Sequence, residues 1–313
     1  MAFMTWPGPG YLPPAPRPGC VPLRPLGVSD ILDGSFTMIR RNPKVTLGLS
    51  AVVAAAQVLL VALLELLSFA VFGNIDVTNA NNPNASTGLG PLLGDESVQF
   101  VGLVVSTLLG AVLTGMLTAA ITQDVLGVRL DIGQAWALAR PRLGALVAIA
   151  LLTTIVEFLA LLCFIAPGIW LWGVWAVSVP ALMVEGTTVR AALRRSRHLV
   201  RGTFWRVWGI RALGALIVQV VAGIIAVPFA IVGVVVDSDA FSASSGSNHI
   251  PFAFVLLTAL GSAVAATFVA PVRAGIDALL YVDLRMRKEG LDIVLQQSLY
   301  ALPPQPAPPR TAF

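Results

Sequence analysis

Six apolar runs, each about long enough to cross a lipid bilayer, most constrain what this chain can fold into. They lie at residues 45–72, 98–122, 144–165, 168–184, 207–236 and 252–272. A membrane-spanning helix needs about 20 mostly apolar residues, and Ala166-Pro167-Gly168 predicts a tight turn between the third and fourth runs. Only 12% of residues are charged and 57% are hydrophobic, against about 25% and 45–50% in soluble domains. The sequence therefore predicts an all-α polytopic membrane bundle of six transmembrane helices, and it excludes a soluble domain or a disordered chain.

The basic residues are confined to alternate connecting segments. Lys and Arg are absent from segments 73–97, 166–167 and 237–250, and they occur repeatedly in segments 1–44, 123–143, 185–206 and 285–313. Because cytoplasmic loops carry the excess of Lys and Arg, we expect a bacterial plasma-membrane protein with both termini in the cytoplasm. This topology predicts Trp170 and Trp172 near the outer end of the fourth span, and Trp205 and Trp208 at the inner end of the fifth.

Three short amphipathic segments precede the odd-numbered spans, at residues 29–41, 131–140 and 187–201. In the first, helical spacing places Leu32, Phe36 and Ile39 on one face. In the second, Asp131 and Gln134 have the spacing of a capping box. We expect three short cytoplasmic interfacial helices. The predicted organisation is a proline-rich cytoplasmic tail (1–28), a six-helix membrane domain (29–288) and a second cytoplasmic tail with a proline-rich end (289–313).

Three polar residues lie deep in the predicted spans. Gln57, Glu157 and Gln219 fall at similar distances from the cytoplasmic ends of their helices, so they predict one polar layer near mid-membrane. Such a layer serves either as a substrate or proton site or as a set of hydrogen bonds between helices. The second interpretation is favoured because no second deep charge is evident. Arg273 and Asp277, four residues apart, are expected to pair near the cytoplasmic end of the sixth span.

Four arginines in the third amphipathic segment follow helical spacing. Arg190, Arg194, Arg197 and Arg201 fall on one face, as in a helix that lies on an anionic membrane surface. The alternative, of equal weight, is that they only set the topology.

Small residues spaced by four predict a packing stripe on the second span. Its members are Gly102, Ser106, Gly110, Thr114 and Thr118. Such stripes permit close approach of helices, which is the interpretation we favour over a pore lining.

Several longer stretches resemble a known family. They are PLGVSDILDG at 25–34, RRNP at 40–43, AALRRS and HLVRG between 191 and 202, and LLYVDLRMR at 279–287. These stretches resemble an uncharacterised family of actinobacterial multi-pass membrane proteins, related to the membrane domain attached to some glycerophosphoryl diester phosphodiesterases. The resemblance implies a membrane module. It argues against the phosphodiesterase reaction, which in the fused enzymes belongs to a separate soluble barrel.

No catalytic or metal-binding motif stands out in the sequence. Asp237 and Asp239 are two residues apart, which is typical of a solvated loop and only weak support for a cation site. Cys20 and Cys163 lie in settings too different to predict a disulfide. We therefore expect neither a cofactor nor a metal.

The function expected from the sequence is a non-enzymatic module that organises lipid or envelope-associated proteins at the cytoplasmic membrane. Its expected partners are anionic headgroups on the cytoplasmic side and proteins that bind the proline-rich tails, and no nucleic acid. The alternative is a small transporter or permease that uses the mid-membrane polar layer.

Overall fold

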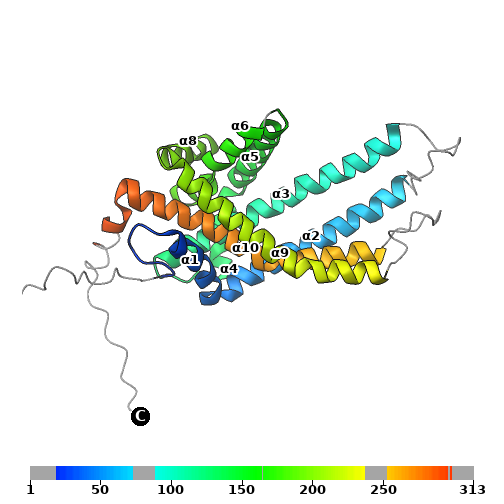
Figure 1. Cartoon of the computed structure of the whole chain (residues 1–313), viewed down its shortest axis with the longest axis horizontal. Helices are drawn as coiled ribbons and strands as arrows, with labels where there is room; N and C mark the ends of the chain where they lie inside the picture. Colours follow the sequence, from blue (N-terminus) through cyan, green and yellow to red (C-terminus); the bar gives the residue numbers. More distant parts are fainter. Residues whose placement is uncertain (1–18, 73–88, 164, 237–251, 295–296, 298–313) are drawn as a thin grey trace, which may run out of the picture.

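The computed structural model describes residues 19–72, 89–163, 165–236, 252–294 and 297, and every regular element in these residues is helical (Figure 1). The elements are α1 (Val28–Arg41), α2 (Pro43–Phe72), α3 (Leu89–Val125), α4 (Ile132–Ala139), a 3₁₀ turn η1 (Arg140–Arg142), α5 (Leu143–Cys163), α6 (Ile165–Val174), α7 (Ser178–Glu185), α8 (Val189–Val200), α9 (Phe204–Val236) and α10 (Phe252–Glu289). This order agrees with the predicted all-α class.

Six helical segments are long and apolar enough to cross a membrane. They lie in α2, in α3, in α4–α5, in α6–α7, in α9 and in α10. Large apolar side chains such as Leu216, Ile224 and Val235 are exposed along α9, which is favourable only where lipid rather than water covers them. The chain is thus a multi-pass membrane protein.

The helix boundaries depart from the sequence prediction in two places. α5 ends at Cys163 and α6 begins at Ile165, so residues 166–168 lie in the first turn of α6 rather than in a turn between two helices; Pro167 costs no hydrogen bond there, because the first N–H groups of a helix have no intrahelical partner. A second break, which was not predicted, separates α6 from α7 at residues 175–177. The fourth apolar run is therefore two short helices rather than one.

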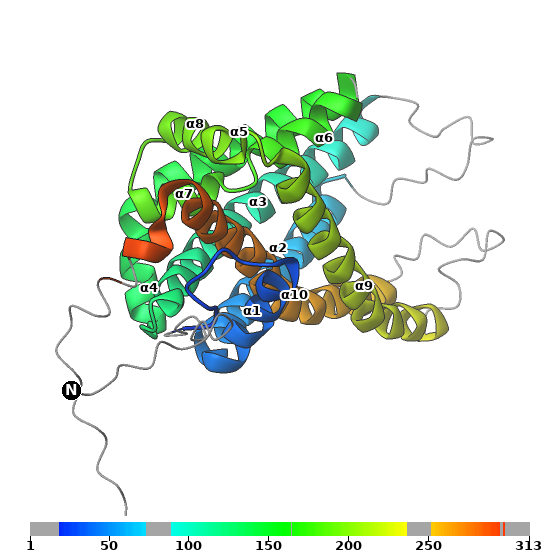
Figure 2. The same cartoon turned by 60° about the vertical axis from the view of Figure 1, so that its left-hand side comes forward.

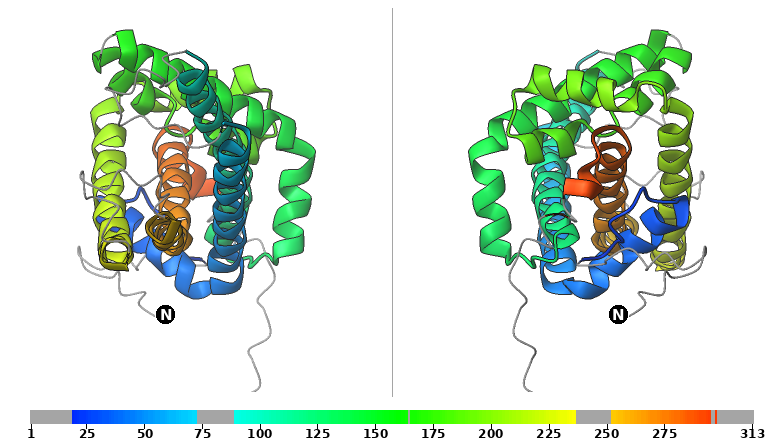
Figure 3. Two further views of the ribbon diagram at one scale, coloured as in Figure 1. Left: turned by 90° about the vertical axis from the view of Figure 1, so that its right-hand side faces the viewer. Right: turned by 90° about the vertical axis from the view of Figure 1, so that its left-hand side faces the viewer.

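α10 occupies the centre of the helix arrangement. It packs against α9, α2, α1 and α3, and the end-on views of Figure 3 place it between α9 and the α2–α3 pair. In Figure 1, α2, α3, α9 and α10 extend toward one end of the molecule, and α1, α4 and α8 gather at the other. The three amphipathic segments are thus helices that share one end of the bundle, as their common cytoplasmic assignment requires.

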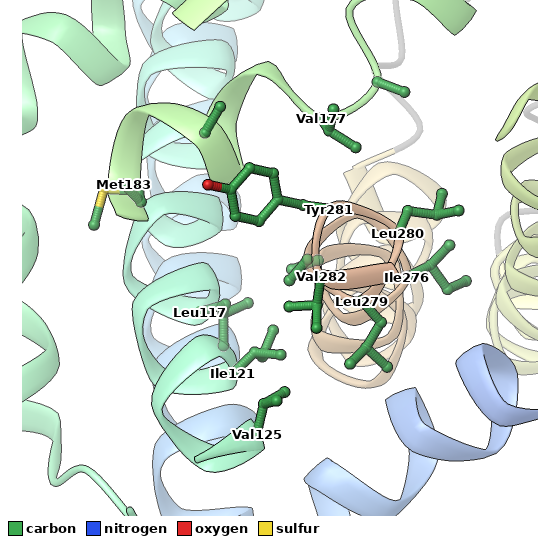
Figure 4. Packing of buried hydrophobic residues seen from close by; sticks show 14 of the residues in the cluster. Leu117, Ile121, Val125, Val177, Met183, Ile276, Leu279, Leu280, Tyr281 and Val282 are labelled. Atoms are coloured by element: carbon green, nitrogen blue, oxygen red, sulfur yellow. The ribbon is translucent and has the colours of Figure 1, made fainter. Parts of the chain in front are cut away.

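The buried core also lies at this end. It surrounds the second half of α10, where Leu279, Leu280 and Tyr281 are almost fully buried. Leu117 and Ile121 of α3 belong to the same cluster of buried side chains (Figure 4). Packing is therefore concentrated around the short helices, whereas large apolar side chains such as Leu59, Leu162 and Val235 are exposed in the described parts of the spans.

The N-terminal segment before α1 corrects the predicted flexible tail. Val21, Leu23 and Leu26 are buried in the core, and Figure 2 shows the segment crossing beside α1 and the C-terminal part of α10. The tail prediction for 1–28 is therefore wrong over 19–28, and residues 1–18 lie outside the described ranges.

The two cysteines differ in their surroundings. Burial, followed by the negative charge of Asp124, raises the pKa of the Cys20 thiol to about 12. Cys20 and Cys163 are both free, as expected.

α1 packs on the protein through a face other than the one that carries the predicted apolar residues. The buried face consists of Ile31, Gly34, Ser35 and Met38. Of the residues predicted to share the apolar face, Leu32 and Ile39 are partly buried and Phe36 is 41% exposed. The reason is that α1 crosses α10 closely, so small residues, rather than the largest apolar ones, face the crossing.

Candidate functional site

The basic helix α8 is anchored to the protein along one face. Ala192, Ser196, Leu199 and Val200 are buried, and the Ser196 hydroxyl donates a hydrogen bond of 2.8 Å to the carbonyl oxygen of Val174. This attachment fixes which side chains of α8 point away from the protein.

The opposite face of α8 carries the four predicted arginines, which we call the arginine face: Arg190, Arg194, Arg197 and Arg201. All four are exposed. In the described part of the chain, no hydrogen bond or ion pair joins their guanidinium groups to another residue. Arg195, on the same helix, instead forms ion pairs with Glu185 at 2.6 Å and with Glu289 at 2.5 Å. The arginine face is thus available for ligands outside the protein.

A groove of about 560 Å³ adjoins the arginine face, between α6, α8 and the start of α9. Its basic side chains are Arg194, Arg197, His198 and Arg201. Its apolar side chains are Trp170, Val174 and Phe204. A cationic wall and an aromatic wall therefore face the same space.

Aromatic rings cluster around the start of α9. The rings of Trp205 and Trp208 lie 6.2 Å apart, and those of Trp172 and Trp208 lie 6.4 Å apart, both in edge-to-face geometry. The sequence placed Trp172 and Trp208 near opposite membrane surfaces, so this expectation is wrong. Because the break at 175–177 shortens α6, that helix packs against α8 and the start of α9.

An ion pair within the candidate spans was also missed. Arg211 of α9 pairs with Asp277 of α10 at 3.2 Å, donates a hydrogen bond to the carbonyl oxygen of Trp172, and lies 4.5 Å from the centre of the Trp172 ring. The expected Arg273–Asp277 ion pair is replaced by a contact between helices, because Gly214 lets Ile276 of α10 approach α9 closely. From the sequence, Asp277 was placed near one end of the sixth span, and Arg211 was not considered as its partner.

The predicted polar layer is not assembled. Gln57 donates to the backbone oxygen of Ser106 over 3.5 Å, Gln219 is exposed on α9, and Glu157 is half-buried on α5. Among the described residues, no hydrogen bond joins any two of Gln57, Glu157 and Gln219. α3 contacts both α2 and α5, and α10 contacts both α2 and α9.

The small-residue stripe of α3 has mixed surroundings. A Cβ atom at Gly102 would make an ordinary contact with Leu64, and one at Gly110 would meet open space. Ser106 and Thr114 are half-buried, and Thr118 is fully buried. The close approach occurs off the stripe at Gly115, where Leu146 of α5 fills the space that a side chain would need. Close packing of α3 therefore does not follow the predicted line.

A buried carboxylate at the C-terminal end of α10 holds the N-terminal segment. Asp283 is 0% exposed; it accepts hydrogen bonds from the Leu26 amide at 2.8 Å, from Arg206 at 2.6 Å and from Arg287 at 2.9 Å. Both arginines also donate to the Leu26 carbonyl oxygen, at 2.7 and 2.8 Å. In the sequence, this site was indicated only by the position of Asp283 among apolar residues, and nothing there showed that Leu26, Arg206 and Arg287 would be its partners.

The remaining sequence candidates yield no described site. Asp237 and Asp239 lie outside the described residues. Within the described ranges, no group of three or more His, Cys, Asp or Glu side chains is placed to hold a metal ion.

Comparison with known proteins adds no assignment. No family model, curated protein or solved structure matches the chain. The family resemblance noted in the sequence therefore stays a prediction.

Proposed function

We propose that this multi-pass membrane protein is a non-enzymatic module that gathers anionic lipids at the cytoplasmic face of a bacterial plasma membrane, and through them organises envelope-associated proteins. The observation that carries the proposal is the arginine face. Arg195, Arg206 and Arg287 are each ion-paired with a carboxylate of the protein, whereas the four arginines of that face are exposed and their guanidinium groups engage no other described residue.

The expected strength of this attraction is substantial. A basic residue near an anionic leaflet contributes about 1 kcal/mol, so the four together contribute on the order of 4 kcal/mol. The other amphipathic helices support a surface location, since Ile132, Trp136 and Leu138 of α4 and Phe36 of α1 are exposed. Apolar side chains on short helices at the same end of the bundle are suited to insertion at the lipid headgroup level.

The test is the anionic lipid retained by the purified protein. Changing Arg190, Arg194, Arg197 and Arg201 together to Gln should lower the phosphatidylglycerol that co-purifies, measured by lipid mass spectrometry, because the attraction depends on charge. The matched control changes the same four residues to Lys, which keeps the charge and should keep most of the lipid. Equal lipid content in the Gln variant and the wild type would contradict the proposal.

The alternative, a small transporter, is supported by a different observation. Arg211 and Asp277 form an ion pair inside the candidate spans, and intramembrane charges commonly mark transport pathways. Each charge is neutralised by the other, and Arg211 also holds α6 through Trp172. We therefore favour a structural role for this pair and retain lipid binding as the main proposal.

A further inference from the structure

We infer that the groove between α6, α8 and α9 is a discrete site for one anionic glycerophospholipid, whose phosphate lies against Arg194, Arg197 and Arg201. The inference rests on the proposed function and deepens it, because it replaces diffuse attraction to a charged surface with a single site of defined lining.

The charge of the groove selects an anion. Its ionisable lining residues are three arginines and His198, and none of the described lining residues is acidic. The nearby carboxylates of Glu185 and Glu289 are already paired with Arg195, which does not line the groove. Guanidinium groups bind phosphate through paired, charge-assisted hydrogen bonds, so a phosphate ester is the best-matched ligand.

The apolar wall of the groove selects a lipid rather than a soluble phosphate. Trp170, Val174 and Phe204 line the groove together with the arginines, and Phe204 is also the first residue of the α9 candidate span. The groove thus lies where a transmembrane helix meets its interfacial aromatic residues, at the level of lipid headgroups. Its volume of about 560 Å³ suits a headgroup with its glycerol, and the acyl chains would continue along the exposed apolar surface of α9.

The site is held in place before any ligand arrives. The Lys288 ammonium donates hydrogen bonds of 3.0 Å to the carbonyl oxygen of His198 and 2.6 Å to that of Arg201. These bonds fix the C-terminal turn of α8, on which two of the three arginines lie. A binding surface that is already ordered loses less entropy on binding.

The test is native mass spectrometry of the full-length protein in detergent, titrated with phosphatidylglycerol, with phosphatidylcholine as the neutral comparison. One phosphatidylglycerol should bind ahead of all others. Arg197→Gln and Arg201→Gln should each weaken this first binding about tenfold, as expected for loss of one charge-assisted hydrogen bond. Arg190→Gln is the comparison within the same arginine face, because Arg190 does not line the groove; it should weaken the first binding event clearly less than Arg197→Gln does, since its charge contributes only to the attraction of the wider surface.

The apolar wall has its own matched pair. Trp170→Ala should weaken the first binding event, whereas Trp205→Ala should leave it unchanged, because Trp205 is 78% exposed and does not line the groove.

The possible failures are distinguishable. Equal losses from Arg190→Gln and Arg197→Gln would overturn the discrete site but leave the proposed function intact. Competition by glycerol 3-phosphate at concentrations similar to those of the lipid would also overturn it, in favour of a soluble ligand. Undiminished lipid binding after all four arginines become Gln would remove the proposed function together with the site.

Discussion

At the residue scale, Asp283 is the contact on which the N-terminal segment most depends. Asp283→Asn keeps the shape of the side chain but leaves Arg206 and Arg287 without their buried counter-charge. We expect a loss of about 3 kcal/mol in the free energy of unfolding, as for other buried pairs that lose one partner, measured by thermal unfolding in detergent. Arg24→Gln is the control, because the Arg24–Asp30 pair is exposed and is worth less than about 1 kcal/mol. Equal stabilities of the two variants would show that the Asp283 contacts do not hold the fold.

Individual exposed side chains were easier to predict than buried pairs. The spacing of Arg190, Arg194 and Arg197 places them on one face of any helix, and the structure confirms that this face of α8 is exposed. The pairing of Arg211 with Asp277 depends instead on how α9 crosses α10. A rule for residues four apart in one helix contains no information about such a crossing.

At the scale of the elements, the close crossing of α1 and α10 depends on Gly275. A Cβ atom there would lie 2.9 Å from the Cβ and 3.2 Å from the Cα of Ser35, so Gly275→Ala must push α1 away. We expect a loss of about 1–3 kcal/mol in the free energy of unfolding, the usual cost of overpacking, measured by thermal unfolding in detergent.

A second glycine in a long helix gives the control for this substitution. A Cβ atom at Gly223 of α9 would meet nothing within 4 Å, so Gly223→Ala should be neutral or stabilising by up to about 1 kcal/mol, from helix propensity alone. If both alanine variants have the same melting temperature, the α1–α10 crossing is looser than described.

Helices were predicted well because the sequence signals for them are local. The packing of segments against one another, and some of the breaks between helices, were not predicted. Apolar runs and helical spacing indicated all of the long spans and α1, α4 and α8. The break at 175–177 itself carries no Gly or Pro, and the nearby Pro180, in the first turn of α7, was equally compatible with one kinked helix. Residues 19–27 were assigned to a tail by their prolines, and only the partners on α10 explain why Leu26 is buried.

At the scale of the whole molecule, the buried core and the exposed basic residues of α8 are concentrated at one end. The three amphipathic helices, the buried half of α10 and the arginine face lie at the same end of the bundle (Figure 1). The C-terminal ends of α2 and α9 lie at the other, and in the sequence they are followed by segments 73–97 and 237–250, which lack Lys and Arg. The proposed binding of anionic lipids of the cytoplasmic leaflet by the arginine face requires that this end of the molecule faces the cytoplasm.

Side-specific cysteine labelling tests this central claim most directly. In a variant without the native cysteines, single cysteines are placed at Asp131 and Arg190, which are exposed at the amphipathic end, and at Ser86 and Ser244 in the segments without basic residues. An impermeant maleimide added to intact cells should label positions 86 and 244, and it should reach positions 131 and 190 only after permeabilisation, because the positive end is retained inside. Labelling of position 190 in intact cells would place the arginine face outside and contradict the account.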